Sequence, residues 1–343
     1  MIDIYDVAKK ANVSIATVSR VINNKVVVSQ KKKDLVLSVI EELGYVPSYA
    51  AKNMRIESSG YIGLLLPSIT VPFYPYLIKS IDDYINEFNY SLVISSTDFE
   101  PGKIKKQLDI FKSKKIDGII YDGLGTEKEE KILEDFLNKT HIPVVFLENY
   151  IDNVKSSYII NDNYYGAYEA TKYLAGLGHK KIAVINTKPN LYQDKERFNG
   201  YVNALKDSSI EFDNSLIFTT DEVNISDGYK ACDALISSKN RPTAIFCLSD
   251  VLAFGALKYL YEKKVKVPDE ISVLGYDDIE FSSICYPPLT TVHQRKKKMG
   301  LSAAKVLMKN IELIRNHVKE IRTKIVLKPY LVIRESTGPC RDL

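Results

Sequence analysis

The first part of the chain alternates short amphipathic stretches with polar turns. Residues 4–11 place apolar side chains three and four positions apart behind a capping Asp3, and residues 15–22 repeat the pattern behind Ser14. The same apolar spacing predicts a third helix over residues 29–44. Two short helices joined by a three- or four-residue turn predict a helix-turn-helix, whose second helix enters the DNA major groove. Periodicity alone favours equally an αα-hairpin packed in some other core.

The outward face of the helix expected over 15–22 carries side chains suited to DNA. Arg20 has the planar fork that binds guanine O6 and N7. The short hydrogen-bonding side chains of Thr17, Ser19 and Asn23 suit phosphate oxygens. If the first stretch is a helix-turn-helix, this face is the one that reads the operator.

A helix-prone segment follows over 48–56. Isolated helices of that length are marginal in water, so we expect this one to be ordered only when something holds it. Ala50, Ala51 and Met54 give it an apolar side on which a partner could pack.

From Gly60 onward, apolar runs alternate with amphipathic stretches. The expected strands lie near 61–67, 91–97, 118–122, 143–148, 158–162, 181–186, 216–220, 244–248 and 272–276, with helices at about 74–89, 101–114, 127–139, 163–177, 193–207, 226–238 and 250–264 between them. Strands buried on both faces and separated by helices form parallel sheets. The pattern therefore predicts an α/β protein with two successive doubly wound units behind a small helical head.

Ligands of open parallel sheets bind beyond the carboxyl ends of the strands. The residues at those ends are Ser68–Tyr74, Thr97-Asp98, Tyr121-Asp122, Glu148, Asp162, Asn186–Tyr192, Ser249-Asp250, Asp277-Asp278 and His293-Gln294. Carboxylates bind pairs of hydroxyl groups and aromatic rings cover apolar sugar surface, so this set predicts a polyhydroxylated ligand. Phe73 suits core packing equally well, and Asp162, Asp250 and Asp278 can instead cap the helices that follow.

Arg197 is the only arginine between Arg55 and Arg241, in a region whose other basic residues are lysines. A planar guanidinium binds a carboxylate or phosphate through two parallel hydrogen bonds, which a lysine cannot do. We therefore expect Arg197 in the ligand site, where it could also receive an anion.

Composition limits the possible classes of protein. The chain has 343 residues, of which 45% are hydrophobic and 26% charged, which is typical of a globular protein with two or three units. No apolar run approaches the ~18 residues of a membrane span, and no basic leader precedes an apolar stretch at the start. The four cysteines form no C-x-x-C pair, so neither disulfides nor a zinc site is expected and a reducing cytoplasm is indicated.

The net charge of +4 is distributed unevenly along the chain. Residues 1–60 hold nine Lys and Arg against six Asp and Glu, so three of the four net charges lie in about a sixth of the chain. A small basic head on a nearly neutral body favours contact with a polyanion.

No pattern of an enzyme is complete. The four histidines have no H-x-x-x-H or H-E-x-x-H spacing, and neither a G-x-S-x-G elbow nor a P-loop occurs. Gly123 and Gly125 follow an expected strand, but Lys128 stands where a dinucleotide site needs glycine. We therefore predict no catalytic residues, no metal site and no cofactor.

The sequence also resembles a known family. Its head and the segment after it contain IYDVAKKANVSIATVSRVINN and EELGYVPSYAAKNM, which are similar to the head and hinge of the lac repressor/galactose repressor family of bacterial transcription regulators. The resemblance implies that Ile15, Ala16 and Arg20 read bases. It also implies that Met54 matches the apolar wedge which paired hinge helices insert into the minor groove. The DNA contacts expected in all are Ser14, Ile15, Ala16, Thr17, Ser19, Arg20, Asn23, Ala51 and Met54.

The resemblance continues through PSITVPFYPYLIKSID, NDNYYGAYEATKYLAGLGHKKIAVI, RPTAIFCLSDVLAFGALKYL, VPDEISVLGYDDIEF and YPPLTTVHQ. It implies an effector core akin to periplasmic sugar-binding proteins, with three crossovers between its halves. The expected parts are a head over 1–47, a hinge and linker over 48–59, a first subdomain of 60–160 plus about 291–320, and a second of 161–290 plus about 321–343. The expected effector contacts are Phe73, Tyr74, Asp98, Glu148, Asp162, Arg197, Ser249, Asp277 and Gln294, with Asp277 as the carboxylate paired to Arg197.

Together these features predict a cytoplasmic repressor that binds a pseudo-palindromic operator in double-stranded DNA as a homodimer. A small-molecule effector, a sugar or sugar derivative, would control its affinity from between the two subdomains. A nucleobase effector is an alternative. So is a protein corepressor, which could meet three exposed-looking lysines at 296–298, although a solvated face explains them better. A solute-binding protein without DNA function is the rival from another class, and the head opposes it.

Overall fold

The computed structural model describes residues 2–22, 28–45, 58–123, 125–150, 156–187 and 192–341. The chain divides into two compact units, a head of Met1–Gly60 and a core of Tyr61–Leu343. Three of the expected DNA contacts, Asn23, Ala51 and Met54, lie outside the described residues, as does the hinge segment 48–56.

The described part of the head consists of three helices, Ile4–Lys10 (α1), Ile15–Ile22 (α2) and Gln30–Leu43 (α3). Asp3 begins α1 as expected, because its carboxylate accepts hydrogen bonds from the backbone N–H groups of Tyr5 and Asp6. Gly44 ends α3 at a φ of 60°, in the left-handed region that favours glycine. Buried side chains from all three helices form the core of the head: Val7, Ala8, Ala11, Val18, Val21, Val36 and Val39.

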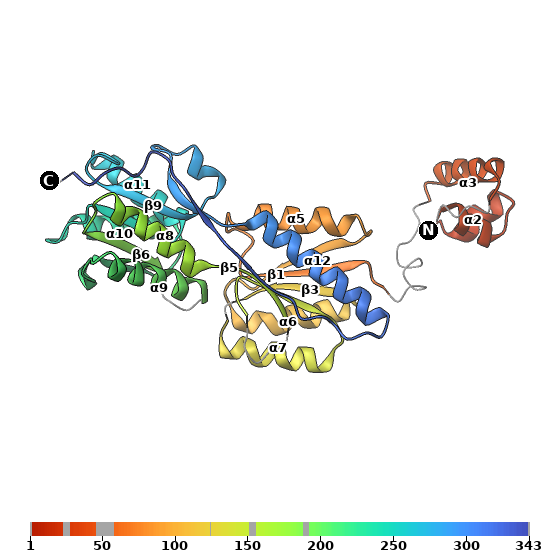
Figure 1. The fold of residues 1–343 in the computed structure, drawn as a ribbon. Coiled ribbons are helices and arrows are strands. Elements are labelled where there is room, and N and C mark those ends of the chain that lie inside the picture. The colour runs from red at the N-terminus through yellow and green to blue at the C-terminus, as the bar shows by residue number, and fades with distance from the viewer. Residues whose placement is uncertain are drawn as a thin grey trace. The chain divides into compact units, whose positions relative to one another are not determined.

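Two six-stranded sheets form the described part of the core (Figure 1). The first sheet has the order β11-β5-β4-β3-β1-β2 and is parallel throughout. The second has the order β12-β10-β9-β8-β6-β7 and is parallel except for the β10–β12 pair. The strands are Tyr61–Leu66 (β1), Ser91–Ser96 (β2), Gly118–Asp122 (β3), Val144–Leu147 (β4), Ser157–Asn161 (β5), Ile182–Thr187 (β6), Ile217–Thr220 (β7), Ala244–Cys247 (β8), Ser272–Asp277 (β9), Thr290–His293 (β10), Lys324–Leu327 (β11) and Tyr330–Val332 (β12).

Helices cover both faces of each sheet (Figure 1). They are Tyr74–Asn86 (α5), Pro101–Ser113 (α6), Glu127–Lys139 (α7), Asn163–Gly176 (α8), Tyr192–Asp207 (α9), Ile225–Ile236 (α10), Asp250–Glu262 (α11) and Lys296–Arg315 (α12), with short 3₁₀ turns at Asn214–Leu216 and Glu280–Ser283. Successive side chains of a strand point to opposite faces, so on β1 Leu64 packs against α5 and α12, whereas Leu65 packs against α6 and α7. In the second half, α8 and α9 cover one face and α10 and α11 the other.

The chain passes between the halves three times, after β5, after β10 and after β11. Two expected boundaries need correction. The first subdomain does not resume at about 291, because β10 extends the second sheet to His293. The return to the first sheet begins with α12, at Lys296. The second does not resume at about 321, because Lys324–Leu327 pairs with β5 of the first sheet. Pro329 separates β11 from β12, since proline cannot donate a hydrogen bond to a ladder, and the two strands join different sheets.

Candidate DNA-reading helix and ligand cavity

Ser14 fixes the start of α2. Its Oγ accepts a hydrogen bond from the backbone N–H of Thr17 at 3.2 Å and lies 2.9 Å from the Thr17 Oγ1. These contacts satisfy a backbone donor that the first turn of a helix otherwise leaves without a partner. The end of α2 that a helix-turn-helix presents to base edges is therefore held in place within the head itself.

The two faces of α2 differ in burial as the sequence predicted. Val18 and Val21 are buried in the core of the head, whereas Ile15, Ala16 and Arg20 are exposed to solvent. Ile15 keeps a branched apolar side chain 39% exposed, a cost that contact with a thymine methyl group would offset. Two further expected contacts, Thr17 and Ser19, are partly buried.

A cavity of about 120 Å³ lies where the carboxyl ends of both sheets meet. Its first-half wall consists of Pro67, Val71, Phe73, Tyr74, Phe99, Asp122 and Glu148. Its second-half wall consists of Thr187, Gln193, Asp194, Arg197, Val223, Leu248, Ser249, Leu252, Asp277 and Gln294. Both halves thus contribute polar side chains to one cavity, which is the arrangement expected of a ligand site in this class of fold.

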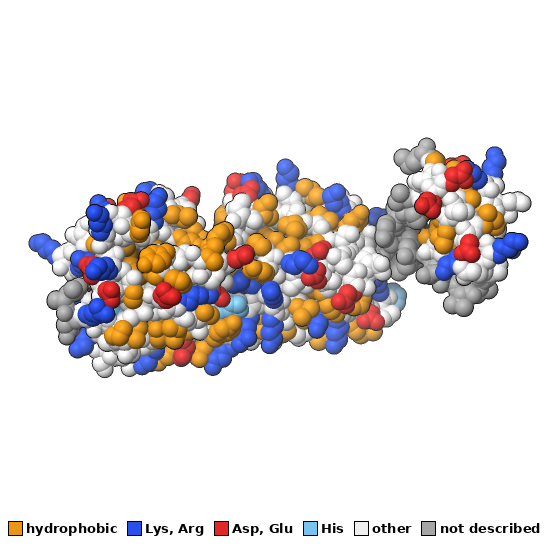
Figure 2. All heavy atoms as spheres, turned by 90° about the horizontal axis from the view of Figure 1, so that it is seen from above, with side chains coloured by type: hydrophobic (Ala, Val, Ile, Leu, Met, Phe, Trp, Pro, Cys, Tyr) orange, Lys and Arg blue, Asp and Glu red, His pale blue; other side chains and the backbone are white. Residues whose placement is uncertain are grey.

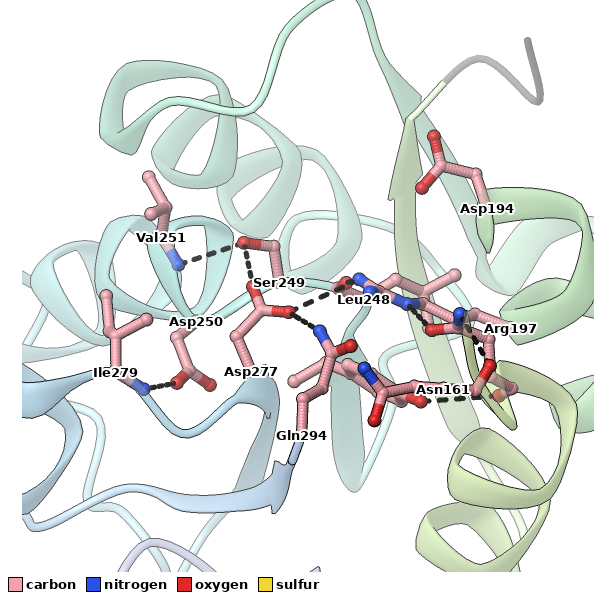
Figure 3. A network of polar contacts seen from close by, with 12 residues as sticks. Asn161, Asp194, Arg197, Leu248, Ser249, Asp250, Val251, Asp277, Ile279 and Gln294 are labelled. Carbon is pink, nitrogen blue, oxygen red and sulfur yellow. Dashed lines mark hydrogen bonds and ion pairs between the residues drawn. The ribbon is translucent and has the colours of Figure 1, made fainter. Parts of the chain in front are cut away.

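Arg197 on α9 organises the second-half wall (Figure 3). Its Nη1 lies 3.5 Å from the Asp277 Oδ1 and donates to the Leu248 carbonyl at 2.8 Å, while its Nε donates to the Asn163 Oδ1 at 2.9 Å. The guanidinium also lies 4.0 Å from the centre of the Tyr276 ring. Contacts on several sides hold the planar group in one orientation, as the isolated position of this arginine in the sequence suggested.

The carboxylate of Asp277 is held equally firmly. It accepts hydrogen bonds from the Gln294 Nε2 at 2.6 Å and the Ser249 Oγ at 3.2 Å, in addition to its ion pair with Arg197 (Figure 3). Burial raises the pKa of Asp277, and the positive charge of Arg197 opposes that rise. Burial alone would lower the pKa of Arg197, but the neighbouring carboxylates raise it, so the guanidinium stays charged.

The first-half wall contains two carboxylates with fewer partners. Glu148 accepts hydrogen bonds from the Asn161 Nδ2 at 2.6 Å and the Asn163 Nδ2 at 3.2 Å. Asp122 accepts one from the Tyr74 hydroxyl at 2.9 Å. Burial raises the pKa of both carboxylates, and the charge of Glu148 raises that of Asp122 further, well above its ordinary value. This wall is strongly acidic and no guanidinium or ammonium comes from its own lining residues.

Comparison with known proteins identifies the chain. Residues 3–48 match the family described as bacterial regulatory proteins, lacI family, and residues 59–331 match the periplasmic binding proteins and sugar binding domain of the LacI family. The chain is also 36% identical over 337 residues to the HTH-type transcriptional regulator DegA of Bacillus subtilis, with 98% of each chain covered. The chain belongs to the LacI family. It is accordingly a DNA-binding transcription regulator and not an enzyme.

Other members of the LacI family have the same fold. The crystal structure of the lac repressor dimer bound to operator and the anti-inducer ONPF has a TM-score of 0.85 and 25% identity, with 98% of this chain and 99% of that chain covered. The complex of the transcriptional regulator CelR with cellobiose has a TM-score of 0.71 and 26% identity. The HTH-type transcriptional repressor PurR of Mannheimia succiniciproducens is 32% identical over 336 residues. The predicted family and the predicted fold class are both confirmed.

Seven of the nine expected effector residues line the cavity of this LacI-family core: Phe73, Tyr74, Glu148, Arg197, Ser249, Asp277 and Gln294. The other two lie elsewhere. Asp98 is exposed in a turn with a φ of 51° and pairs with Lys103 at 2.9 Å. Asp162 caps α8, since its Oδ1 accepts a hydrogen bond from the Tyr165 N–H, which is the structural role considered as the alternative.

Asp122, Gln193 and Asp194 are cavity residues that the sequence-based set omitted. Asp122 ends β3, so the strand-end rule pointed to it, but nothing local distinguished it from other acids at strand ends. Asp194 belongs to the first turn of α9 and lies three residues before Arg197, the spacing that brings both side chains to one face of a helix. Helical spacing from the isolated arginine was thus the signal that could have found it.

Two acids expected as possible caps have another role. Asp250 accepts hydrogen bonds from the Ile279 N–H, the Ser282 hydroxyl and the Thr291 hydroxyl, which joins α11 to the segments around β10. Asp278 pairs with His293 and Arg334. Within the described residues, no group of three potential metal ligands occurs, and no helix is long and apolar enough to cross a membrane.

Proposed function

We propose that the protein is a repressor that binds a pseudo-palindromic operator as a homodimer and that a small polyhydroxylated ligand in the cavity controls its operator affinity. The observation that carries the ligand half of this proposal is the set of oriented carboxylates and one fixed guanidinium between the two halves. Carboxylate pairs recognise vicinal hydroxyl groups, and the rings of Phe73 and Tyr74 offer an apolar surface beside them. The cellobiose complex of CelR, a similar structure, supports a sugar or sugar derivative.

The DNA half rests on α2. Its exposed residues Ile15, Ala16 and Arg20 would contact bases, with Ser14, Thr17 and Ser19 near the backbone. The predictions for Asn23, Ala51 and Met54 remain predictions. Two such helices in a dimer would occupy successive major grooves about 10 bp apart. The lac repressor, a similar structure, was solved as a dimer on its operator.

Exposed apolar side chains support the homodimer. Phe281, Ile284 and Tyr286 follow one another around the 3₁₀ turn after β9, and Ile284 and Tyr286 are 72% and 83% exposed. Figure 2 shows apolar side chains gathered in several places on one face of the core. Burial of a segment this apolar against a second copy would remove its unfavourable contact with water.

Ligand binding would act on the operator by closing the two halves of the core. A ligand shifts such an equilibrium only by its differential affinity for the two states, so the cavity must fit one arrangement better. Lys296, the first residue of α12, provides a link between the halves: its Nζ donates hydrogen bonds to the backbone carbonyls of Asp277 and Asp278. The rest of α12 packs against α5 in the first half. Movement at the cavity would therefore reach the first half through α12.

The alternative of a protein corepressor was based on three lysines at 296–298 that looked exposed in the sequence, and one of them is buried. Of the three lysines at 296–298, Lys296 is buried and only Lys297 and Lys298 are exposed. Lys297 lies 5.1 Å from the centre of the Tyr76 ring. A nucleobase remains the second candidate ligand, because a flat heterocycle could stack on the rings of Phe73 and Tyr74.

Selection of bound sequences from a random duplex library tests the proposal. We expect the full chain to enrich a pseudo-palindrome whose half-sites are about one helical turn apart. The enriched duplex is then titrated at fixed salt with and without sugars and nucleobases, and one of them should change the Kd. Failure to enrich any sequence would contradict the DNA half, and a Kd that no ligand alters would contradict the control by a ligand.

A further inference from the structure

Three buried oxygen atoms of cavity residues accept no hydrogen bond, the Asp122 Oδ1, the Gln193 Oε1 and the Gln294 Oε1. Asp122 and Gln294 are 2% and 1% exposed. The orientation of the Gln294 amide is fixed, because its Nε2 donates to the Asp277 carboxylate at 2.6 Å and an amide oxygen there would be repelled. Buried acceptors without a donor are costly, so these atoms call for a ligand that donates hydrogen bonds.

These acceptors lie on both walls of the cavity. Asp122 ends β3 of the first sheet, and Gln294 follows β10 of the second. A ligand that reaches both must carry donors on two sides, and it would connect the halves of the core as it binds. A ligand that carries hydrogen-bond acceptors but no donors would leave these atoms without partners.

The charges of the cavity are unbalanced. Four carboxylates line it, those of Asp122, Glu148, Asp194 and Asp277, and Arg197 is the one cation among the described lining residues. Arg197 is engaged by Asp277, Asn163 and the Leu248 carbonyl. Asp194 accepts a hydrogen bond from the Thr187 hydroxyl at 2.7 Å, which adds no positive charge.

The deficit is greatest at the first-half wall. Glu148 receives only the neutral amides of Asn161 and Asn163, and Asp122 receives only the neutral hydroxyl of Tyr74. The charge of Arg197 lowers the pKa of Glu148 from the opposite wall, but no cation among the described residues acts on Asp122, and the charge of Glu148 raises the pKa of Asp122 further. Asp122 therefore lacks the charge that would offset its loss of water.

We propose that the ligand carries a protonated amino group, seated against Asp122 and Glu148, on a compact scaffold of hydroxyl groups such as an amino sugar or another aminated polyol. This inference rests on the proposed function, in which the cavity is the ligand site. An ammonium supplies three donors and the missing charge at once, whereas a hydroxyl supplies one donor and no charge. A phosphate or carboxylate ligand would add negative charge beside four acids and is excluded.

The proposal also determines the proton balance of binding. Burial and the charge of Glu148 raise the pKa of Asp122. An ammonium ion beside this carboxyl would lower its pKa again, so any proton that the carboxyl holds in the ligand-free protein is released on binding. A neutral polyol would leave the proton in place.

Matched pairs of sugars test the proposal on the full chain. We would measure the thermal midpoint with D-glucosamine, D-galactosamine and D-mannosamine, each beside its parent hexose and its N-acetyl derivative. At least one amine should stabilise the protein and bind about tenfold more tightly than both neutral partners, since charge-assisted hydrogen bonds are the stronger kind. The proposal is overturned if no amine in the panel raises the midpoint, or if a parent hexose binds as tightly.

Two variants locate the amine. Asp122→Asn removes the charge while keeping an oxygen for the Tyr74 hydroxyl, and it should abolish the preference for the amine. Asp98→Asn removes an exposed acid outside the cavity and should keep the preference. Equal preference in both variants would overturn the assignment.

Calorimetry of the wild-type protein in two buffers of different ionisation enthalpy provides a readout that does not depend on the variants. At a pH well below the pKa of the free amine, where the ligand is already protonated, no net proton uptake is expected on binding, and uptake there would contradict the proposal. The two proposals also fail separately. An amine that binds without changing operator affinity would refute the regulatory role, whereas a neutral sugar that changes operator affinity would refute the ammonium site alone.

Discussion

Arg20 and Arg197 place the same side chain in opposite surroundings. Arg20 lies exposed on α2, and the core of the head is formed without it. Arg197 is buried, with hydrogen bonds to two neighbours, an ion pair to Asp277 and the ring of Tyr276 beneath it. The head thus leaves the side chain of Arg20 exposed, whereas the core holds that of Arg197 in place before any ligand binds.

In the head, a change at Arg20 should affect function without affecting stability. In the core, a change at Arg197 should affect both. Arg20 is exposed and is proposed to make its contacts on DNA, so a change there should not affect the stability of the folded protein. A change at Arg197 leaves the buried Asp277 carboxylate without its cation, which lowers the free energy of unfolding even when no ligand is present. The following experiments test this contrast, from the largest expected effect to the smallest.

Replacement of the buried arginine should cost the most. Arg197→Met retains much of the volume but leaves Asp277 without its cation, and breaking a buried ion pair on one side costs about 3–5 kcal/mol of unfolding free energy. Urea denaturation followed by circular dichroism measures the loss. The same substitution at Arg20 is the control and should change the stability by less than about 0.5 kcal/mol. Equal losses would remove the contrast.

Lys296→Met should have the next largest effect. The Nζ of this buried lysine donates to two backbone carbonyls at the end of β9, and their loss should cost about 1–3 kcal/mol in the same denaturation experiment. Its exposed neighbour provides the control, Lys297→Met, which should be close to neutral. If both variants unfold at the wild-type midpoint, Lys296 does not hold the two halves together.

Arg20→Ala should weaken discrimination at one base position of the operator by about 1–3 kcal/mol and leave the urea midpoint unchanged. Competition titrations with single base substitutions at fixed salt measure this. Uniform weakening on every sequence would show that Arg20 contacts phosphate instead, and the reading role assigned to it would be wrong.

The smallest effect concerns pH. Burial raises the pKa of Asp122 in the folded state, so its contribution to stability is present below the ordinary value near ~4 and is lost as the pH rises through the folded value. Relative to the wild type, Asp122→Asn should therefore become more stable as the pH rises from about 4 to about 7.

The control for this pH series changes in a lower pH range. The hydrogen bond from Lys103 lowers the pKa of Asp98, so its stabilising contribution is complete above the ordinary value near ~4 and is lost as the pH falls through the lowered folded value. The stability difference between Asp98→Asn and the wild type should thus stay nearly constant from about pH 4 to about pH 7, the range in which Asp122→Asn gains stability. Parallel pH profiles for the two variants would contradict the burial of Asp122.

The sequence predicted those features that depend on local pattern. Apolar spacing located α2 and its exposed face, and the strand-end rule led to Glu148, Asp277 and most of the cavity. The isolated arginine among lysines led to Arg197, which lines the cavity.

Features that depend on distant partners were not predictable in this way. The environment of Asp122 is set by Tyr74, 48 positions away, and no local signal reports that contact. Asp98 follows the end of another strand, as Asp122 does, and was therefore expected in the cavity. Its backbone instead adopts a left-handed turn, and its carboxylate pairs with Lys103. The strands β11 and β12 join different sheets because β11 pairs with β5 of the first sheet, a pairing that only the folded chain reveals.

Reciprocal titration tests the control of the operator by the cavity most directly. The Kd of the selected operator is measured with and without the tightest ligand of the panel, and the Kd of that ligand with and without operator. Coupled sites must change each other's affinity by one common factor, expected to be about 5- to 150-fold. We expect both ratios to agree within that range. A ligand that binds the free protein and the operator complex with equal affinity would contradict the coupling.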